Sequence, residues 1–420
     1  LSNPAKNGTT DVIIEHSRFS YHSSGILQSA CPNSFQTAEL TNNTFMNNTF
    51  VGNNGGVLAM NARYQNLTLT NNTWTGNQAR LGGCIYLTCL NGIQIILVDN
   101  ETVVENTATL NGGFLTISSS SSDLSIILSL SKFLRNSASR IGGVVEMVTV
   151  GTSFYLQVDR CQVEDSQAAY GGAFYSNTSG VQNHSIFLTN SQFVRNTASQ
   201  HGGILYSQVA GGTQHIQINS STIQGNMAIH MIGSTDGLQT LSLLNVSITT
   251  SLDTNEAVLV NMTSEGVVTQ QLWVADSNIS NIRGSAFDLT SNSNQLVSFQ
   301  NTIMKQVNTL GGAALKLVTT GTQEIRWEDS TWESCQSTSS GGILSANNVT
   351  VLNVTNCQFK QNTALGGGLF QVQSNPTGCE ATFQSNSFVQ NQAKDAVIKV
   401  DDNIHSQIAN HTVVDDTPLH

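Results

Sequence analysis

The sequence has few charged residues and no long uninterrupted apolar run. Asp, Glu, Lys and Arg make up 10% of the 420 residues, and the formal net charge is −11. Because proteins that bind nucleic acid contact phosphates through clustered Lys and Arg, and no such cluster occurs, we expect no nucleic-acid partner. A helix that spans a bilayer needs roughly 18–20 apolar residues, so we expect no membrane span. The chain starts at Leu1 without a signal peptide, which indicates a mature or truncated form.

Cysteine is present at seven positions, but its spacing excludes the usual zinc-binding patterns. There is no Cys-x-x-Cys and no paired Cys/His motif, so we expect no metal and no other cofactor. The odd number leaves at least one cysteine unpaired within the chain. Cys84 with Cys89, and Cys357 with Cys379, are the candidate disulfides. Buried thiols are the alternative, because connectivity cannot be read from a sequence.

What the chain does contain is a repeat. FLRNSASRIGGVVEM, which begins at Phe133, returns as FVRNTASQHGGILYS from Phe193. Each copy has an aromatic residue, two variable positions, Asn, small polar residues, and then Gly-Gly before an apolar strand. The aromatic residue and Asn recur at Phe45/Asn48, Trp74/Asn77, Phe133/Asn136, Phe193/Asn196, Phe359/Asn362 and Phe388/Asn391. The period of roughly 25–31 residues is typical of a solenoid.

Each repeat divides into three extended pieces, such as Phe193 to Asn196, Gly202 to Ser207 and His215 to Asn219. None has the period of a helix, and the last two alternate apolar with polar residues, so one face of each strand is buried. Gly-Gly and Asn stand at the corners, where a positive φ is needed. The pattern therefore predicts an all-β parallel β-helix with three short strands per turn and about 13–14 turns.

No Pro-rich or low-complexity linker interrupts the repeats, which favours one domain over residues 1–420. Residues 1–20 form its N-terminal edge or cap, and residues 392–420 form the C-terminal edge turn and tail. Between residues 227 and 300 the repeat is degenerate, because Gly-Gly disappears while alternation persists in LSLLNVS and QLWVADS. These turns either use other corner chemistry or are selected for another feature.

Repetition also predicts what lies inside the coil. The repeated Phe and Trp side chains would stack in the interior. The repeated Asn would form a structural ladder, in which each amide bonds to the turns above and below. The predicted ladder residues are Asn48, Asn77, Asn106, Asn136, Asn196 and Asn226.

The paired Phe-x-x-Asn and Gly-Gly-apolar motifs resemble the repeats of the chlamydial polymorphic outer-membrane proteins, and more broadly the pectin-lyase-like right-handed parallel β-helix. The resemblance covers most of the chain. It departs at the second motif, because Gly172-Ala173 and Gly312-Ala313 are the two places that keep the Ala which that family favours. The resemblance implies a right-handed coil and an extracellular adhesive or surface role.

Asn-x-Ser/Thr sequons indicate a secreted glycoprotein whose partners include N-linked glycans. The composition alone would give roughly ten of them by chance, and the alternative is that Asn serves the turns. The fifteen sequons begin at Asn7, Asn42, Asn47, Asn66, Asn71, Asn100, Asn177, Asn183, Asn219, Asn245, Asn261, Asn278, Asn348, Asn353 and Asn410.

A search for catalytic groups finds one local set of carboxylates, Asp159, Glu164 and Asp165, next to Arg160. A glycosidase needs two carboxyl groups about 5–10 Å apart, and the alternative is that these residues are solvated turn residues. His201-Gly202 resembles the catalytic His-Gly corner of pectin hydrolases, but the Asp-Asp and basic partners are missing, so that role is not carried over.

A binding surface is predicted from the position three residues past the second Gly. Tyr86, Glu146, Tyr175 and Tyr206 share this position, and alternation points their column outward. Rings on neighbouring turns could stack on a sugar or on a partner chain.

The ends of a solenoid expose unpaired backbone groups, and neither end of this chain reads as an amphipathic capping helix. Stacking of ends would produce a homopolymer, while short polar loops at the ends are the alternative. We therefore expect a non-enzymatic, extracellular structural or adhesive glycoprotein, with a surface filament as one form. Its partners would be an extracellular carbohydrate or a surface protein. The alternatives are a carbohydrate-binding module and a polysaccharide lyase or hydrolase.

Overall fold

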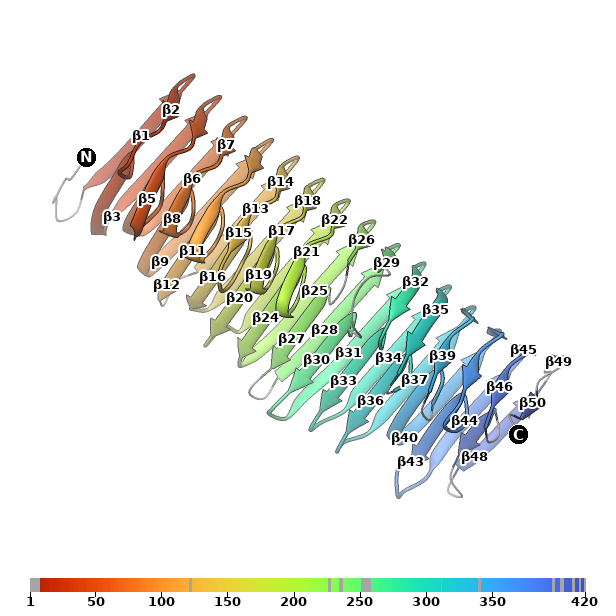
Figure 1. The fold of residues 1–420 in the computed structure, drawn as a ribbon. Helices are drawn as coiled ribbons and strands as arrows, with labels where there is room; N and C mark the ends of the chain where they lie inside the picture. The colour runs from red at the N-terminus through yellow and green to blue at the C-terminus, as the bar shows by residue number, and fades with distance from the viewer. Residues whose placement is uncertain are drawn as a thin grey trace. The chain divides into compact units, whose positions relative to one another are not determined.

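The computed structural model describes residues 8–120, 123–225, 228–233, 237–250, 258–310, 312–338, 341–394, 397–400, 404–409, 412–414 and 417–418. The chain is a parallel β-solenoid of about 13 turns, with three parallel sheets and three strands per turn (Figure 1). The predicted all-β class, the parallel pairing and the three-strand turn are therefore confirmed.

Sheet A contains the longer strands, which in most turns follow the Gly-Gly corner. They are β1 (Thr9–Glu15), β3 (Leu27–Thr41), β6 (Leu58–Thr70), β9 (Ile85–Asp99), β12 (Leu115–Ser120), β13 (Asp123–Ser129), β16 (Val145–Val150), β17 (Ser153–Asp159), β20 (Phe174–Ser179), β21 (Asn183–Thr189), β24 (Leu205–Ala210), β25 (Gly212–Asn219), β27 (Ile229–Gly233), β28 (Gly237–Leu244), β30 (Val260–Ser264), β31 (Val268–Ala275), β33 (Phe287–Ser291), β34 (Gln295–Gln300), β36 (Leu315–Thr319), β37 (Gln323–Glu328), β40 (Leu344–Thr355), β43 (Phe370–Ser374), β44 (Cys379–Gln384), β47 (Ile398–Val400) and β48 (Ile404–Ala409).

Sheet B contains the short strands that carry the aromatic residue of the repeat. Late in the chain it also contains the short strand that follows each of them. They are β2 (Arg18–Ser20), β4 (Thr44–Met46), β7 (Thr73–Thr75), β10 (Thr102–Val104), β14 (Lys132–Leu134), β18 (Gln162–Glu164), β22 (Gln192–Val194), β26 (Thr222–Gln224), β29 (Ser247–Thr249), β32 (Asn278–Arg283), β35 (Ile303–Thr309), β38 (Thr331–Glu333), β39 (Gln336–Ser337), β41 (Gln358–Lys360), β42 (Thr363–Ala364), β45 (Ser387–Val389), β46 (Gln392–Ala393), β49 (Thr412–Val414) and β50 (Thr417–Pro418).

Sheet C contains the strands that lead into the Gly-Gly corner. They are β5 (Thr49–Asn54), β8 (Gln78–Leu81), β11 (Thr107–Asn111), β15 (Ser137–Ala138), β19 (Gln167–Tyr170) and β23 (Thr197–His201).

The chain divides into two compact units. Unit 1 contains Leu1–His215 and Met227–His230, and unit 2 contains Ile216–Asn226 and Met231–His420. The division falls next to the start of the degenerate stretch that the sequence marks at residues 227–300.

The two glycines of the corner are needed for different reasons. The first adopts a positive φ, for example 64° at both Gly112 and Gly142, which residues with a Cβ rarely adopt. The second lies against the next turn, because a Cβ on Gly113 would collide with the carbonyl oxygen of Gly143. Backbone conformation therefore requires glycine at the first position, and the close approach of neighbouring turns requires it at the second.

An amide ladder runs through unit 1 at the corner between sheets B and C. The Nδ2 of Asn48 donates to the Oδ1 of Asn77 at 2.8 Å, and Asn77 donates in the same way to Asn106 at 2.9 Å. Asn106 continues the ladder to Asn136 at 3.1 Å. Each Nδ2 also donates to a backbone carbonyl of another turn, as Asn77 does to Phe45 at 2.9 Å. The buried amides are thus fully hydrogen-bonded.

The ladder changes beyond Asn136. Ser166 occupies the next place, and its backbone N–H donates to the Oδ1 of Asn196 at 3.1 Å. The Nδ2 of Asn196 donates to the carbonyl of Val163 at 2.7 Å. Asn226, the last predicted member, lies outside the described residues.

A second interior ladder, which the sequence analysis missed, lies at the corner before sheet B. Asn43 donates to Asn72 at 3.0 Å, and Asn72 donates to the Oε1 of Glu101 at 2.9 Å. The indole N–H of Trp74 donates to the other carboxylate oxygen of Glu101 at 2.5 Å. Burial raises the pKa of Glu101 to about 7, although the donors from Asn72 and Trp74 favour its ionised form.

A glutamine ladder supports turns of unit 2 within and beyond the degenerate stretch. Gln270 donates to Gln239 at 3.0 Å, and Gln295 donates to Gln270 at 2.8 Å. Gln323 adds a further step to Gln295 at 2.8 Å. All four side chains are buried. Turns that lack the Gly-Gly corner are therefore joined by hydrogen bonds between buried glutamine side chains.

Aromatic side chains stack in the interior of each unit, as predicted. The ring centroids of Phe45 and Trp74 are 4.2 Å apart in unit 1, and those of Phe359 and Phe388 are 5.0 Å apart in unit 2.

Neither candidate disulfide is present. Cys84 and Cys89 are separated along the extended start of β9, too far for the roughly 7 Å limit between bridged Cα atoms, and Cys89 donates to a backbone carbonyl. Cys379 is also out of reach of Cys357, because the register pairs its neighbour Glu380 with Val351, and Cys357 lies six residues farther along that turn. The seven cysteines are buried, as in the alternative interpretation.

Candidate functional site

One outward-pointing column on sheet A contains the four residues selected from the sequence. The parallel register gives it one residue per turn, in the order Tyr86, Thr116, Glu146, Tyr175 and Tyr206. Tyr86 and Tyr175 are partly exposed, whereas Glu146 and Tyr206 are 4% and 8% exposed. Thr116 is also buried, at 2% exposure, so the column is covered at three of its five members.

The rings of this column contact one another. Tyr175 and Tyr206 stack with their centroids 5.2 Å apart and their planes 3° apart, and Tyr206 stacks on His230 with 5.2 Å and 6°. Because each ring covers the face of its neighbour, Tyr206 has no open face on which a sugar could stack. Binding elsewhere along the column stays a prediction.

A second column, formed by the residue directly before each Gly-Gly pair, packs beside the first. Asn111, Tyr170 and His201 stand in this position. Tyr170 meets Tyr206 edge-on at 5.3 Å, and His201 stacks on His230 at 4.6 Å. Sequence analysis missed this packing, although the position before Gly-Gly marks the column in each regular repeat.

Glu146, in the first column, is hydrogen-bonded by one residue from each column. The Nδ2 of Asn111 donates to its Oε1 at 2.9 Å, and the Thr116 hydroxyl lies 3.0 Å from its Oε2. Burial raises the pKa of Glu146 to about 7, against the opposing effects of Thr116, Asn111 and Arg140. When protonated, Oε2 can donate to the Thr116 hydroxyl, which lies 3.0 Å from the Asn111 carbonyl and donates to it. The neutral carboxyl group is thus fully hydrogen-bonded.

His230 lies at the end of the ring stack, next to Tyr206, and its pKa is lowered where that of Glu146 is raised. Burial, with the neighbouring His201, lowers the pKa of His230 to about 4. The imidazole is neutral at pH 7, so it stacks on Tyr206 without carrying a charge.

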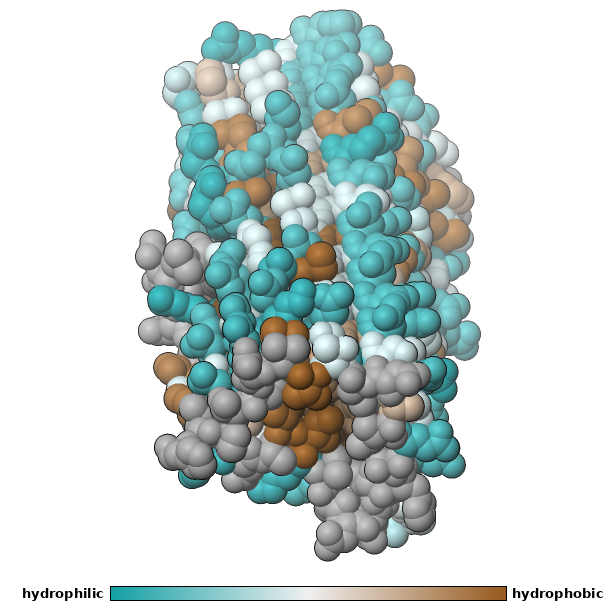
Figure 2. All heavy atoms as spheres, turned by 90° about the vertical axis from the view of Figure 1, so that its right-hand side faces the viewer, coloured by the Kyte–Doolittle hydropathy of each residue, from teal (hydrophilic) through white to brown (hydrophobic). Residues whose placement is uncertain are grey.

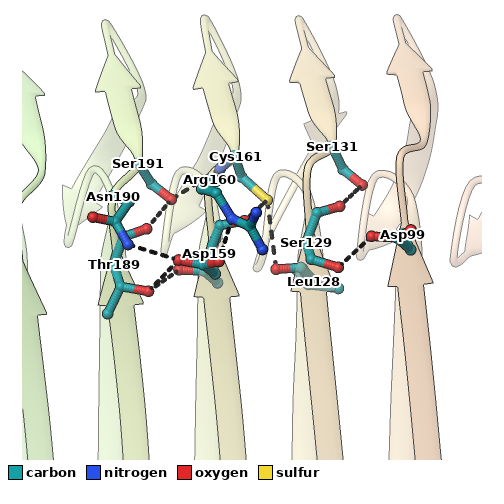
Figure 3. Close-up of polar contacts among 11 residues, drawn as sticks. Asp99, Leu128, Ser129, Ser131, Asp159, Arg160, Cys161, Thr189, Asn190 and Ser191 are labelled. Atoms are coloured by element: carbon teal, nitrogen blue, oxygen red, sulfur yellow. Dashed lines mark hydrogen bonds and ion pairs between the residues drawn. The ribbon is translucent and has the colours of Figure 1, made fainter.

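Asp159, a carboxylate considered for catalysis, stabilises a corner of unit 1 (Figure 3). It accepts hydrogen bonds from Thr189 at 2.8 Å, Asn190 at 2.9 Å and Arg160 at 2.7 Å. Burial opposes ionisation, but the hydrogen bonds from Asn190, Arg160 and Thr189 hold the pKa of Asp159 below its usual value. An ionised group with these partners fits the solvated-turn interpretation.

Asp165 and Glu164 have a different arginine. Arg195 forms a bidentate pair with Asp165, at 2.7 and 2.8 Å, and lies 3.9 Å from Glu164. The hydrogen bonds from Arg195 hold the pKa of Asp165 below its usual value. Each of the two candidate carboxylates, Asp159 and Asp165, therefore has its own guanidinium partner.

Comparison with known proteins gives a partial family match. Residues 4–145, which are 142 of the 420 residues, match the model of the periplasmic copper-binding protein (NosD) family. No protein with a curated description matches this sequence. Among solved structures, an alginate lyase of the PL6 family, AlyGC, aligns over 98% of this chain and 84% of its own, with 8% identity and a TM-score of 0.25.

The described sequon asparagines are all at least partly accessible. Asn42, Asn66, Asn71, Asn100, Asn183, Asn245, Asn278 and Asn353 are exposed, and Asn47, Asn177, Asn219, Asn261 and Asn348 are partly exposed. Asn7 and Asn410 lie outside the described residues. Six of these residues have a positive φ near 55°, which gives Asn a structural reason to be there. They are Asn42, Asn47, Asn71, Asn100, Asn245 and Asn348.

The described part of the chain contains neither a cluster of metal ligands nor a helix suited to crossing a bilayer. No three His, Cys, Asp or Glu side chains there gather closely enough to hold a metal ion. The same residues contain no helix with the length and apolar character needed to cross a bilayer.

Proposed function

We propose that the chain is a non-enzymatic scaffold outside the cytoplasm, with a structural or adhesive role at a cell surface or in an extracellular fibre. The observation that carries this proposal is the set of side-chain ladders inside each unit. The Asn48–Asn136 ladder in unit 1 and the Gln239–Gln323 ladder in unit 2 tie successive turns together by hydrogen bonds. Such ladders add stiffness to a stack of parallel strands.

Two observations support a location outside the cytoplasm. The thirteen described sequon asparagines are exposed or partly exposed, as attachment of a glycan requires. The family whose model matches residues 4–145 is described as periplasmic. Glycans on these asparagines would shield the sides of the solenoid from proteases and from lateral aggregation.

Copper binding, which the same family description names, does not fit the donors found here. The described residues offer no cluster of three or more His, Cys, Asp or Glu. Within the matched residues, burial raises the pKa of the Cys84 thiol well above its usual value, which disfavours the thiolate form that binds metals. We derive no role for a metal.

Apolar side chains exposed on β1 and β49 support assembly through these strands. In unit 1, Ile13 on β1 is 65% exposed, and a small cavity of about 20 Å³ among Val12, Leu27 and Met60 opens beneath that strand. In unit 2, apolar side chains gather on the face that carries the C-terminal end (Figure 2), and Val413 on β49 is 63% exposed. A contact between two unlike ends is heterologous and extends into a filament.

Immunogold labelling of intact cells, with electron microscopy of the purified native protein, tests this proposal. We expect label on the surface or on extracellular fibres, and particles joined end to end. Label confined to the cytoplasm would overturn the location. Turnover of a polysaccharide that is lost in Asp159→Ala or Asp165→Ala would overturn the non-enzymatic role and favour the lyase or hydrolase alternative.

A further inference from the structure

An open cavity of about 390 Å³ lies on the outer face of sheet A in unit 1. Its walls come from β3, β5, β6 and β9, and include Gln28, Phe50, Asn61 and Tyr86. Small-molecule sites in proteins are typically about 300–1,000 Å³. The cavity therefore has room for a small ligand.

Small residues form the floor of this cavity. Parallel register places Ala59 between Gln28 and Tyr86 in the outward column, and Ala30 next to Asn61 in the neighbouring one. Farther along the first column the same position holds Glu146, Tyr175 and Tyr206. The hollow is thus present where alanine replaces a long side chain.

An irregularity in β5 forms the remaining wall. Phe50 pairs with Ala79 and Asn54 pairs with Leu81, so three residues of β5 lie opposite one residue of β8. The extra residues bulge out of sheet C, as expected when one strand is longer than its partner. Phe50, Asn53 and Asn54 from this bulge line the cavity.

The lining is neutral, amide-rich and partly aromatic. Its described residues include no Asp, Glu, Lys or Arg. Among the described residues, the Oδ1 atoms of Asn54 and Asn61 are buried without a hydrogen-bond partner. Each amide can therefore gain a hydrogen bond by turning its oxygen toward the cavity. Phe50 and Tyr86 supply apolar surface, while Thr88 adds a hydroxyl group.

We propose that this cavity binds a neutral saccharide. Sugar hydroxyl groups donate to the two unpartnered Asn oxygens, and the apolar face of a sugar ring packs on Phe50 or Tyr86. An acidic sugar would bring a charge into a lining that has no charged side chain. Both Glu146 and Arg80 act electrostatically on Tyr86, Glu146 the more strongly, so the surroundings do not compensate that charge. This inference is independent of the scaffold function and adds a specific ligand class to it.

Isothermal titration of the full chain tests the proposal with cellobiose, maltose and lactose as neutral probes and digalacturonic acid as the acidic one. At least one neutral disaccharide should bind saturably, with the acidic one at least tenfold weaker. Asn61→Ala should weaken binding at least tenfold, and Ala59→Phe should abolish it by filling the floor. Ser125→Phe places the same ring at a partly exposed position on β13 and should bind like the parent chain.

Circular dichroism and thermal unfolding establish that each variant is folded before titration. If Ala59→Phe does not fold, Asn61→Ala decides the question alone. Three results would overturn the proposal: no neutral probe binds, binding is unchanged in the folded cavity variants, or the acidic disaccharide binds as tightly as the neutral ones.

Discussion

Single residues at equivalent places in the repeat have different surroundings. A Cβ on Gly113 would collide with the backbone of the next turn, whereas a Cβ on Gly312 would find Ser285 Oγ nearest, at 3.6 Å. We therefore expect Gly113→Ala to lower the free energy of unfolding by about 3 kcal/mol, and Gly312→Ala to change it by less than about 1 kcal/mol. Denaturant unfolding of both variants measures the two changes in the free energy of unfolding. Equal losses would show that close approach of turns is not what selects the glycine.

The Glu146 carboxyl group should make stability depend on pH. Its folded-state pKa of about 7 lies above its usual value of 4.5, so its contribution is complete below about pH 4.5 and is lost as the pH rises through 7. At about 1.4 kcal/mol per pKa unit, ionisation costs the folded state about 3 kcal/mol above pH 8.

Glu146→Gln is the matched test, because glutamine copies the hydrogen bonds of the neutral acid. Denaturant unfolding should show this variant close to the parent chain at pH 5 and more stable than it at pH 8.5. If the stability difference does not change with pH, Glu146 is ionised in the folded protein throughout this range.

At the scale of the elements, the repeat predicts one of the two ladders in unit 1 but not the other. The column at Asn48 could be predicted, because the same residue type recurs at the same distance from an aromatic residue. The column at Asn43, Asn72 and Glu101 changes residue type, so periodicity alone did not separate buried from exposed members. The corner geometry decides that Asn42 is exposed while Asn43 is buried.

Asn77→Ala should lower the free energy of unfolding by about 3 kcal/mol, because it removes hydrogen bonds from buried groups of Asn48, Asn106 and Phe45. Gln192→Ala, on the exposed side of β22, is the control and should change it by less than about 0.5 kcal/mol. Urea unfolding compares the two variants. A small effect at Asn77 would mean that water replaces the lost amide.

For the whole molecule, the scaffold proposal depends on what the terminal strands contact. Ile13→Lys places a charge at an exposed position of the edge strand β1, a substitution that blocks pairing of edges. We expect sedimentation velocity to show end-to-end oligomers for the parent chain and monomers for Ile13→Lys, with unchanged thermal unfolding. Oligomers that persist in the variant would place the contact elsewhere.

The sequence by itself determined the solenoid, its three-strand turn, the interior rings and the amide column at Asn48, because these features repeat with the period of the coil. Tertiary structure decided the rest. The packing of Glu146 against Asn111, the stack of His230 on Tyr206 and the cavity above Ala59 join residues from different strands and turns. Each depends on corner shape, bulges and side-chain size, which differ from turn to turn and leave no periodic signal.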